Sequence, residues 1–104
     1  MAAHVYILAS KRNGTLYVGC TTDLPKRIFE HRNGLIPGFT KRYGVKRLVH
    51  VETYHDVSDA IVRERRLKDW HRAWKIRLIE RDNPCWDDLA VSLLGFEPLV
   101  AVAR

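Results

Sequence analysis

The dipeptide Asn13-Gly14 is the feature that most restricts the fold of this chain. It lies between two runs of strand-forming residues, "HVYILAS" at 4–10 and "TLYVGC" at 15–20. Asn-Gly is typical of the tight turn that joins two neighbouring antiparallel strands. Parallel strands need a long crossover instead, so this beginning does not suit a doubly wound parallel sheet.

The length of the turn decides where two tyrosines point. Side chains alternate along each strand, so a connecting loop of two or four residues places Tyr6 and Tyr17 on the same face of the hairpin. A three-residue loop would separate them.

The rest of the chain alternates between helical and extended patterns. Asp23 can cap a helix that ends near Asn33, with Pro25 in its first turn and Gly34 as its stop. Downstream we expect a loop at 35–44, a strand at 45–54, a helix from Asp56 or Ser58 to about Trp70, helical sequence at 71–81 that continues it or forms a second helix, and a short helix at 86–95. This order predicts an α+β fold, a small three-stranded, mainly antiparallel sheet with helices packed around it. We expect one domain over residues 1–95 and a C-terminal tail over 96–104.

The charge of the chain proposes a class of partner. The 104 residues carry a formal net charge of +6 and the pI is near 9.7. Nucleic acid is the commonest partner of a basic protein, although an acidic lipid or an acidic protein would satisfy the same charge. No apolar run approaches a membrane span and no signal peptide is visible. With Cys20 and Cys85 far apart, we expect reduced thiols in a cytoplasmic protein with no membrane partner.

One carboxylate lies on an apolar helix stripe. The stripe follows the helical period through Val57, Ala60, Ile61 and Leu67, and Glu64 projects from its middle. A buried carboxylate without a partner is costly, so Glu64 needs a cation or a metal ion beside it. A structural salt bridge to an arginine, or a rim position that reaches water, would also explain its position.

A second pair of polar side chains shares one helix face. Arg27 and His31 are one helical turn apart, just after the second strand. Together with the other candidates they resemble the GIY-YIG nuclease superfamily, in particular its short single-domain members, which are similar to the N-terminal domain of excinuclease C. The matching positions, in chain order, are "VYIL" at 5–8 with Val5 in place of a glycine, Tyr6, "YVG" at 17–19, Arg27, His31 and Glu64.

The resemblance implies a GIY-YIG-like fold, a role in DNA repair and a hydrolytic mechanism. It implies one divalent cation, Mg²⁺ or Mn²⁺, held by Glu64, with Arg27 on a phosphate oxygen. It also implies that Tyr17 deprotonates the attacking water, that His31 accepts the proton of Tyr17, and that Tyr6 orients water or substrate. Cys20 follows "YVG" where several relatives carry a lysine, which removes a cation from this position.

The sequence contains further cationic and aromatic residues that could bind a ligand or pack in the core. Lys41, Arg42, Lys46 and Arg47 form a reasonable surface for gripping a nucleic-acid strand. We interpret Trp70, Trp74 and Trp86 as core residues rather than as platforms for base stacking. The remaining histidines show no zinc spacing and are interpreted as structural; they are His4, His50, His55 and His71.

Three functions are compatible with this sequence. The first is a metal-dependent DNA endonuclease, active on branched, damaged or single-stranded DNA, with RNA also open as a substrate. The second is a non-catalytic nucleic-acid-binding module of the same fold, which the cysteine at position 20 favours. The third is a protein-interaction domain that uses the apolar tail "PLVAVA" at 98–103. We expect a monomer or a weak homodimer.

Overall fold

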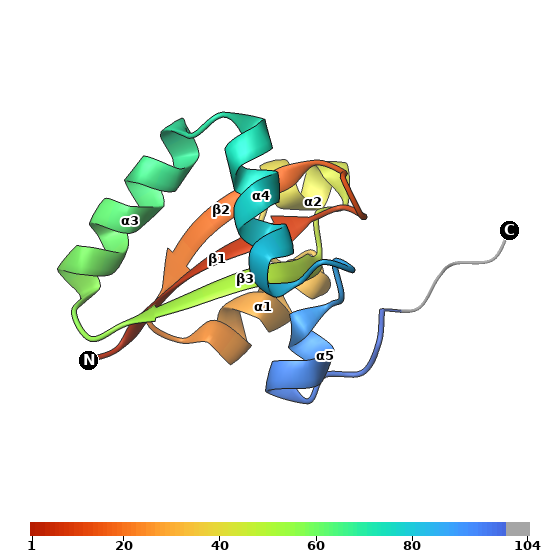
Figure 1. Cartoon of the computed structure of the whole chain (residues 1–104). Helices are drawn as coiled ribbons and strands as arrows, with labels where there is room; N and C mark the ends of the chain where they lie inside the picture. Colours follow the sequence, from red (N-terminus) through yellow and green to blue (C-terminus); the bar gives the residue numbers. More distant parts are fainter. Residues whose placement is uncertain (100–104) are drawn as a thin grey trace, which may run out of the picture.

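The computed structural model describes residues 1–99 and shows a three-stranded antiparallel sheet covered by helices (Figure 1). The strands are β1 (Ala3–Ala9), β2 (Leu16–Thr21) and β3 (Arg47–Tyr54), and β1 lies in the centre of the order β2-β1-β3. Both pairings are antiparallel. The predicted fold class is therefore confirmed, with β3 starting two residues later than position 45.

The hairpin loop has an even length. The Ser10 N–H donates to the Thr15 carbonyl at 3.0 Å, and the Gly14 N–H closes the turn on the Lys11 carbonyl at 2.9 Å. Asn13 takes a φ of 57°, the left-handed conformation that asparagine tolerates well. Because Tyr6 faces Gly19 and Leu8 faces Tyr17 in the resulting register, both tyrosines lie on one face of the sheet.

The helices largely match the predicted segments. They are α1 (Leu24–Arg32), α2 (Phe39–Tyr43), α3 (Val57–Asp69), α4 (Arg72–Asp82) and α5 (Leu89–Leu94). The Asp23 side chain caps α1 by accepting from the Lys26 N–H. Of the two possibilities for residues 71–81, the structure shows a separate helix. None of the helices within residues 1–99 has the length and apolar character that crossing a bilayer requires.

The prediction of a loop at 35–44 is wrong for α2. This short helix begins after Gly38 and ends at Gly44, whose φ of 64° is left-handed. A helix this short has almost no periodicity, so two glycines and a proline nearby hid it from the sequence pattern. It is held in place by Thr40, which is only 3% exposed.

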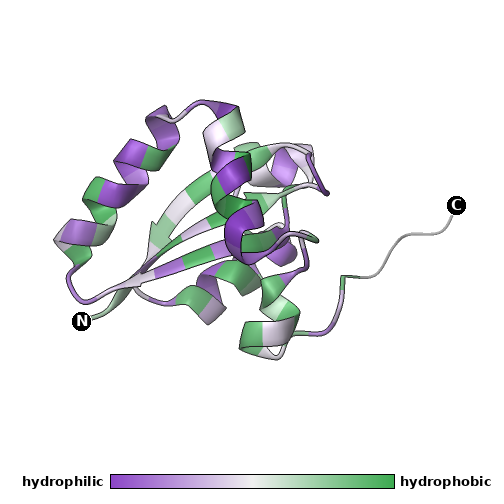
Figure 2. Cartoon of the chain, in the orientation of Figure 1, coloured by the Kyte–Doolittle hydropathy of each residue, from purple (hydrophilic) through white to green (hydrophobic). Residues whose placement is uncertain are grey.

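Two hydrophobic cores lie on the two faces of the sheet. The odd-numbered side chains of β1, such as Val5 and Ile7, pack against α3 and α4, while Tyr6 and Leu8 pack against α1 and α5. Figure 2 shows hydrophobic residues along the strands and hydrophilic ones along much of α3 and α4. The central strand is therefore buried on both faces, and its side chains separate into two environments.

The chain continues to pack past the predicted domain boundary at residue 95. The Phe96 N–H donates to the Ala90 carbonyl at 3.0 Å, and Arg32 of α1 lies over the Phe96 ring. Arg32 also pairs with Asp88 at 2.7 Å and donates to the Glu97 carbonyl. Most of the tail segment "PLVAVA" lies outside the described residues.

A polar network fastens β3 to α3. Glu52 accepts hydrogen bonds from His50, from the Tyr54 hydroxyl and, through both carboxylate oxygens, from the Arg63 guanidinium, all within 2.8–3.0 Å. Burial alone would raise the pKa of Glu52, but the hydrogen bonds from His50, Arg63 and Tyr54 outweigh it and hold the pKa far below its usual range. Glu52 therefore stays ionised and contributes stability at neutral pH.

We expect Glu52→Gln to lower the free energy of unfolding by about 2 kcal/mol, because the amide cannot satisfy the partly buried guanidinium. The carboxyl pKa is lowered by folding, so its stabilisation is present above the ordinary value of 4.5 and is lost as pH falls below it. Denaturant melts between pH 7 and pH 3 should therefore show a shallower loss for the variant than for the wild type. Asp82→Asn is the control, since its pair with Arg81 is exposed and should leave the melt unchanged.

Candidate functional site

A buried hydrogen bond joins β1 to α1 at the centre of the site. The Tyr6 hydroxyl lies 2.9 Å from His31 Nε2, and both side chains are buried. The Tyr6 ring crosses directly over Gly19 of β2. A Cβ atom at Gly19 would lie 2.4 Å from the Tyr6 hydroxyl and ring, closer than real atoms approach. The glycine of the "YVG" segment is therefore required by the position of Tyr6.

His31 has a second partner that the sequence did not indicate. Its Nδ1 lies 3.0 Å from the Thr40 hydroxyl of α2. Burial and the nearby Arg27 charge lower the pKa of His31, while burial and the Tyr17 group raise the pKa of Tyr6. Both groups are therefore neutral at pH 7. A neutral imidazole donates through one nitrogen and accepts through the other, so Tyr6, His31 and Thr40 form one directional hydrogen-bond chain.

Tyr17 completes the aromatic cluster. Its ring centroid lies 5.6 Å from His31, 6.4 Å from Tyr6 and 6.3 Å from Phe39, which stacks on it. The resemblance to the family implied that His31 would accept a proton from Tyr17. Both ring nitrogens of His31 are engaged by Tyr6 and Thr40, so a direct transfer would first have to break one of those two hydrogen bonds.

Glu64 and Arg27 share a shallow cavity beside the cluster. The cavity, of about 370 Å³, lies between the end of β2, the start of α1 and α3; its lining includes Cys20, Arg27, Ile61 and Glu64. The Glu64 side chain is 20% exposed and pairs with the exposed Lys68 at 3.4 Å. The predicted inward carboxylate is thus a rim residue whose ion-pair partner is a lysine. Ile61, expected to face the sheet, is 37% exposed.

Electrostatic effects connect the two halves of the site. In addition to burial, the negative charge of Glu64 raises the pKa of both Tyr6 and Cys20, while Arg27 lowers the pKa of Tyr6. Arg27 therefore lies within range of the tyrosine cluster and also lines the cavity of Glu64. The structure brings together the five candidate site residues. Tyr6, Tyr17 and His31 form one cluster, Glu64 lines the neighbouring cavity, and Arg27 lies near both.

The carboxylate cavity offers one acidic side chain, Glu64, that could hold a divalent cation. Within residues 1–99 no group of three or more histidine, cysteine, aspartate or glutamate side chains could enclose a metal ion. Mg²⁺ does not need such a cage, because it keeps several waters and binds proteins through one or two carboxylates plus substrate phosphates. Glu64 is partly shielded, and its one ion pair among residues 1–99 is a long one with an exposed lysine, so it fits that coordination.

The four cations proposed as a nucleic-acid surface separate into two groups. Lys41 and Arg42 lie exposed on α2, and Lys46 follows that helix half-buried. Arg47 instead donates to the Trp86 carbonyl at 3.1 Å, and its Nε is buried without a partner among the described residues. Arg47 therefore contributes to the packing of the fold rather than to the cationic surface.

The tryptophans and histidines also differ in their surroundings. Trp86 is a core residue, as predicted, and donates to Glu80 at 2.7 Å. The core prediction is wrong for Trp74, which is 49% exposed. His4 bonds Thr53 at 3.0 Å and His50 bonds Glu52, consistent with structural roles.

Residues 2–77 match the family described as the GIY-YIG catalytic domain. The chain belongs to the GIY-YIG family. Within that family it is similar to the small single-domain UPF0213 proteins. It is 37% identical to the UPF0213 protein of Staphylococcus saprophyticus over 73% of this chain and 92% of that protein, and 38% identical to the one from Halobacterium salinarum over 69% and 92%. The solution NMR structure of the UPF0213 protein from Bacillus halodurans matches with a TM-score of 0.54 and 28% identity, covering 88% of this chain and 96% of that one.

Gly19→Ala tests the packing at the centre of this GIY-YIG site. The added methyl should displace the Tyr6 ring, break its bond to His31 and lower the melting temperature by several degrees, about 2 kcal/mol of stability. Tyr6 and His31 side-chain NMR signals should shift together. Cys20→Ala, the next residue on the strand, is the control and should leave those signals in place. Unchanged Tyr6 and His31 signals in Gly19→Ala would contradict the packing described here.

Proposed function

We propose that this protein is a metal-dependent endonuclease that hydrolyses DNA phosphodiester bonds. The observation that carries the proposal is the convergence of Tyr6, Tyr17, Arg27 and His31 beside the cavity of Glu64. Membership of the GIY-YIG family supports the same chemistry. Phosphodiester hydrolysis needs a positioned water, charge neutralisation on the phosphoryl oxygens and help for the leaving group.

Each residue has a role that suits its surroundings. Glu64 would hold one Mg²⁺ or Mn²⁺, which supplies Lewis-acid stabilisation to the phosphate and the leaving oxygen. Arg27, permanently charged and fork-shaped, neutralises a phosphoryl oxygen. Tyr17, acting as a phenolate, would take a proton from the attacking water, whose oxygen bonds to phosphorus as the bond to the leaving oxygen breaks, and solvent would protonate that leaving oxygen. Tyr6, fixed by His31, orients that water or the substrate.

The surface beside Tyr17 suits a nucleic-acid backbone. Phe39 stacks on Tyr17 and contacts Tyr43 at 4.9 Å between centroids, and both are about half exposed. Lys41, Arg42 and Lys46 add positive charge on or just after the same short helix. Phosphate contacts supply most of the non-specific affinity of nucleic-acid-binding proteins, so this surface supports DNA, and also RNA, as a ligand.

The residue at position 20 favours a second function. Cys20 lines the cavity with Arg27 and Glu64, and burial raises the pKa of its thiol, which therefore stays uncharged. Position 20 thus adds no cation where the resemblance to the family leads us to expect a lysine. A nucleic-acid-binding module without catalysis would tolerate that loss better than an enzyme would.

Glu64→Gln against Lys68→Gln separates the metal ligand from the ion-pair partner. Because the amide keeps the shape but not the charge, Glu64→Gln should reduce cleavage of a DNA panel by at least about 100-fold and weaken Mn²⁺ binding measured by calorimetry. Lys68→Gln removes the same ion pair but no metal ligand, so it should keep Mn²⁺ binding and the cleavage rate at saturating DNA. The panel contains single-stranded, nicked, branched and damaged DNA.

Two outcomes would contradict this assignment. Equal losses in Glu64→Gln and Lys68→Gln would assign Glu64 to an ion pair and refute its role as metal ligand. A wild-type protein that binds the DNA panel but cleaves none of it with Mg²⁺ or Mn²⁺ would favour the binding module.

A further inference from the structure

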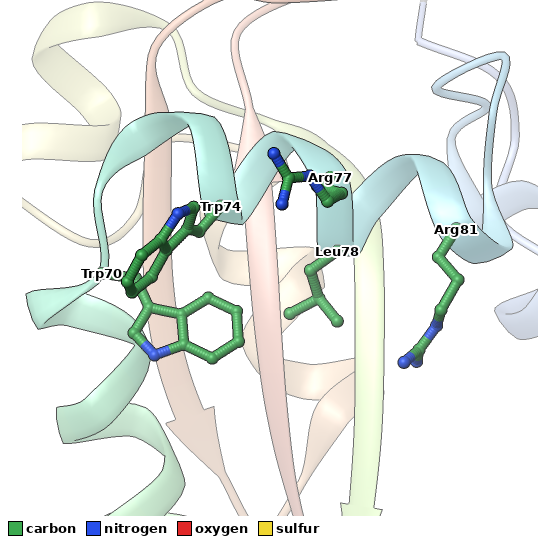
Figure 3. Close-up of a pocket in the computed structure, with 5 residues that line it drawn as sticks. All are labelled: Trp70, Trp74, Arg77, Leu78 and Arg81. Atoms are coloured by element: carbon green, nitrogen blue, oxygen red, sulfur yellow. The ribbon is translucent and has the colours of Figure 1, made fainter.

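A second cavity, of about 450 Å³, lies between the end of α3 and α4, apart from the cavity of Glu64. Its lining combines two indoles with aliphatic and cationic side chains: Trp70, Trp74, Arg77, Leu78 and Arg81 (Figure 3). None of these residues has a role in the mechanism above. Trp74 has about half of its surface exposed, which is costly for so large an apolar ring.

The exposed indole is held in a fixed position. The rings of Trp70 and Trp74 pack edge to face, with their centroids 6.0 Å apart. The His71 ring also packs edge to face with Trp74, at a centroid distance of 5.2 Å. The Arg63 guanidinium lies 5.0 Å from the Trp70 ring centroid and is itself anchored by Glu52. The network that fastens β3 to α3 therefore also supports this groove. A large, rigid and exposed aromatic ring is what base stacking needs.

The charge of the groove selects an anionic ligand. Arg77 is exposed and has no ion-pair or hydrogen-bond partner within the part of the chain that the structure describes. Arg81 pairs with the exposed Asp82, and an exposed pair of this kind yields readily to a phosphate. A cavity lined by two guanidinium groups and an indole suits the two parts of a nucleotide, its phosphate and its base.

A cationic path connects the groove to the candidate active site. Glu64 lies on the β2 side of α3, whereas Arg63 and Trp70 lie on the β3 side. With 3.6 residues per turn, the exposed face between these two sides carries the exposed cations Lys68, Arg65 and Arg66 and one exposed carboxylate, Asp69, so the charge of this face is net positive. A strand that leaves the Glu64 cavity can therefore cross α3 along positive charge and reach the groove.

We propose that the groove between α3 and α4 binds an unpaired nucleotide of a nucleic-acid strand, with its base on Trp74 and its phosphates on Arg77 and Arg81. The inference rests on the proposed function for the kind of ligand. It adds a binding site and a substrate feature, namely an unpaired segment beyond the cleaved bond. A paired base is unavailable for stacking, so duplex DNA would not fill this groove.

The test measures binding in EDTA, so that no metal-dependent cleavage occurs, with labelled dT oligomers, a blunt duplex of equal length and a poly-glutamate peptide. The wild type should bind the single strand with quenching of indole fluorescence. Trp74→Leu should lose about tenfold in affinity and most of the quenching, and Arg77→Gln should lose affinity and salt sensitivity. Phe29→Leu changes an exposed aromatic residue of α1 outside the groove and should match the wild type.

A stability control accompanies the outcomes that would overturn the proposal. The melt of Trp74→Leu is recorded on the same preparation and must match that of Phe29→Leu, so that unfolding does not explain a loss of binding. Three results would show that the groove does not bind a nucleotide. Trp74→Leu could bind the single strand as tightly as the wild type does, or it could lose as much affinity for the duplex as for the single strand. Alternatively, poly-glutamate could quench the indole fluorescence while dT does not.

Cleavage and groove binding are distinguishable in these variants. Cleavage that depends on Glu64, together with binding unaffected by Trp74→Leu, would leave the nuclease standing without the groove. Quenching that is lost in Trp74→Leu, in a wild type that cleaves nothing, would leave the groove standing without the nuclease.

Discussion

The position of Tyr6 constrains most of the structure around it. Its ring lies across Gly19, which only a residue without a side chain permits, and its hydroxyl is fixed on His31. The even-length hairpin loop sets the register that places Gly19 opposite Tyr6. His31 in turn binds Thr40, so the same hydrogen-bond chain positions α2. A hairpin, a helix and a short helical turn are thus held to one face of the sheet by one buried tyrosine.

This arrangement gives the two halves of the site different physical properties. The half formed by Tyr6 and His31 is buried and uncharged at neutral pH, because burial raises the tyrosine pKa and lowers the histidine pKa. The half formed by Arg27 and Glu64 is open to solvent through a shallow cavity. A buried neutral layer beneath an open charged one suits the reaction at phosphate that we propose, because the charged groups remain accessible to a substrate.

The sequence predicted those parts of the fold that follow from local period and turn chemistry. Asn13-Gly14, the cap at Asp23 and the spacing of Arg27 and His31 each act over a few residues, and the structure contains them as expected. Apart from α2, which is too short to show a period, what the sequence missed depends on contacts beyond a single helix or strand. Thr40 is a partner of His31 only because α2 folds back, and Arg47 turns inward because the Trp86 carbonyl accepts its hydrogen bond. Trp74 and Trp86 look alike in the sequence, yet only packing decides that one is half exposed and the other fully buried.

The proposed mechanism depends above all on the Tyr17 hydroxyl, which we propose acts on the attacking water. The most direct measurement is single-turnover cleavage by Tyr17→Phe, with Tyr43→Phe as the control. The control removes a hydroxyl from an exposed aromatic residue outside the hydrogen-bond chain of Tyr6, His31 and Thr40. We expect metal-dependent cleavage by the wild type, a loss of at least about 100-fold in Tyr17→Phe, and nearly full activity in Tyr43→Phe. Cleavage by Tyr17→Phe at the wild-type rate would contradict this role of Tyr17.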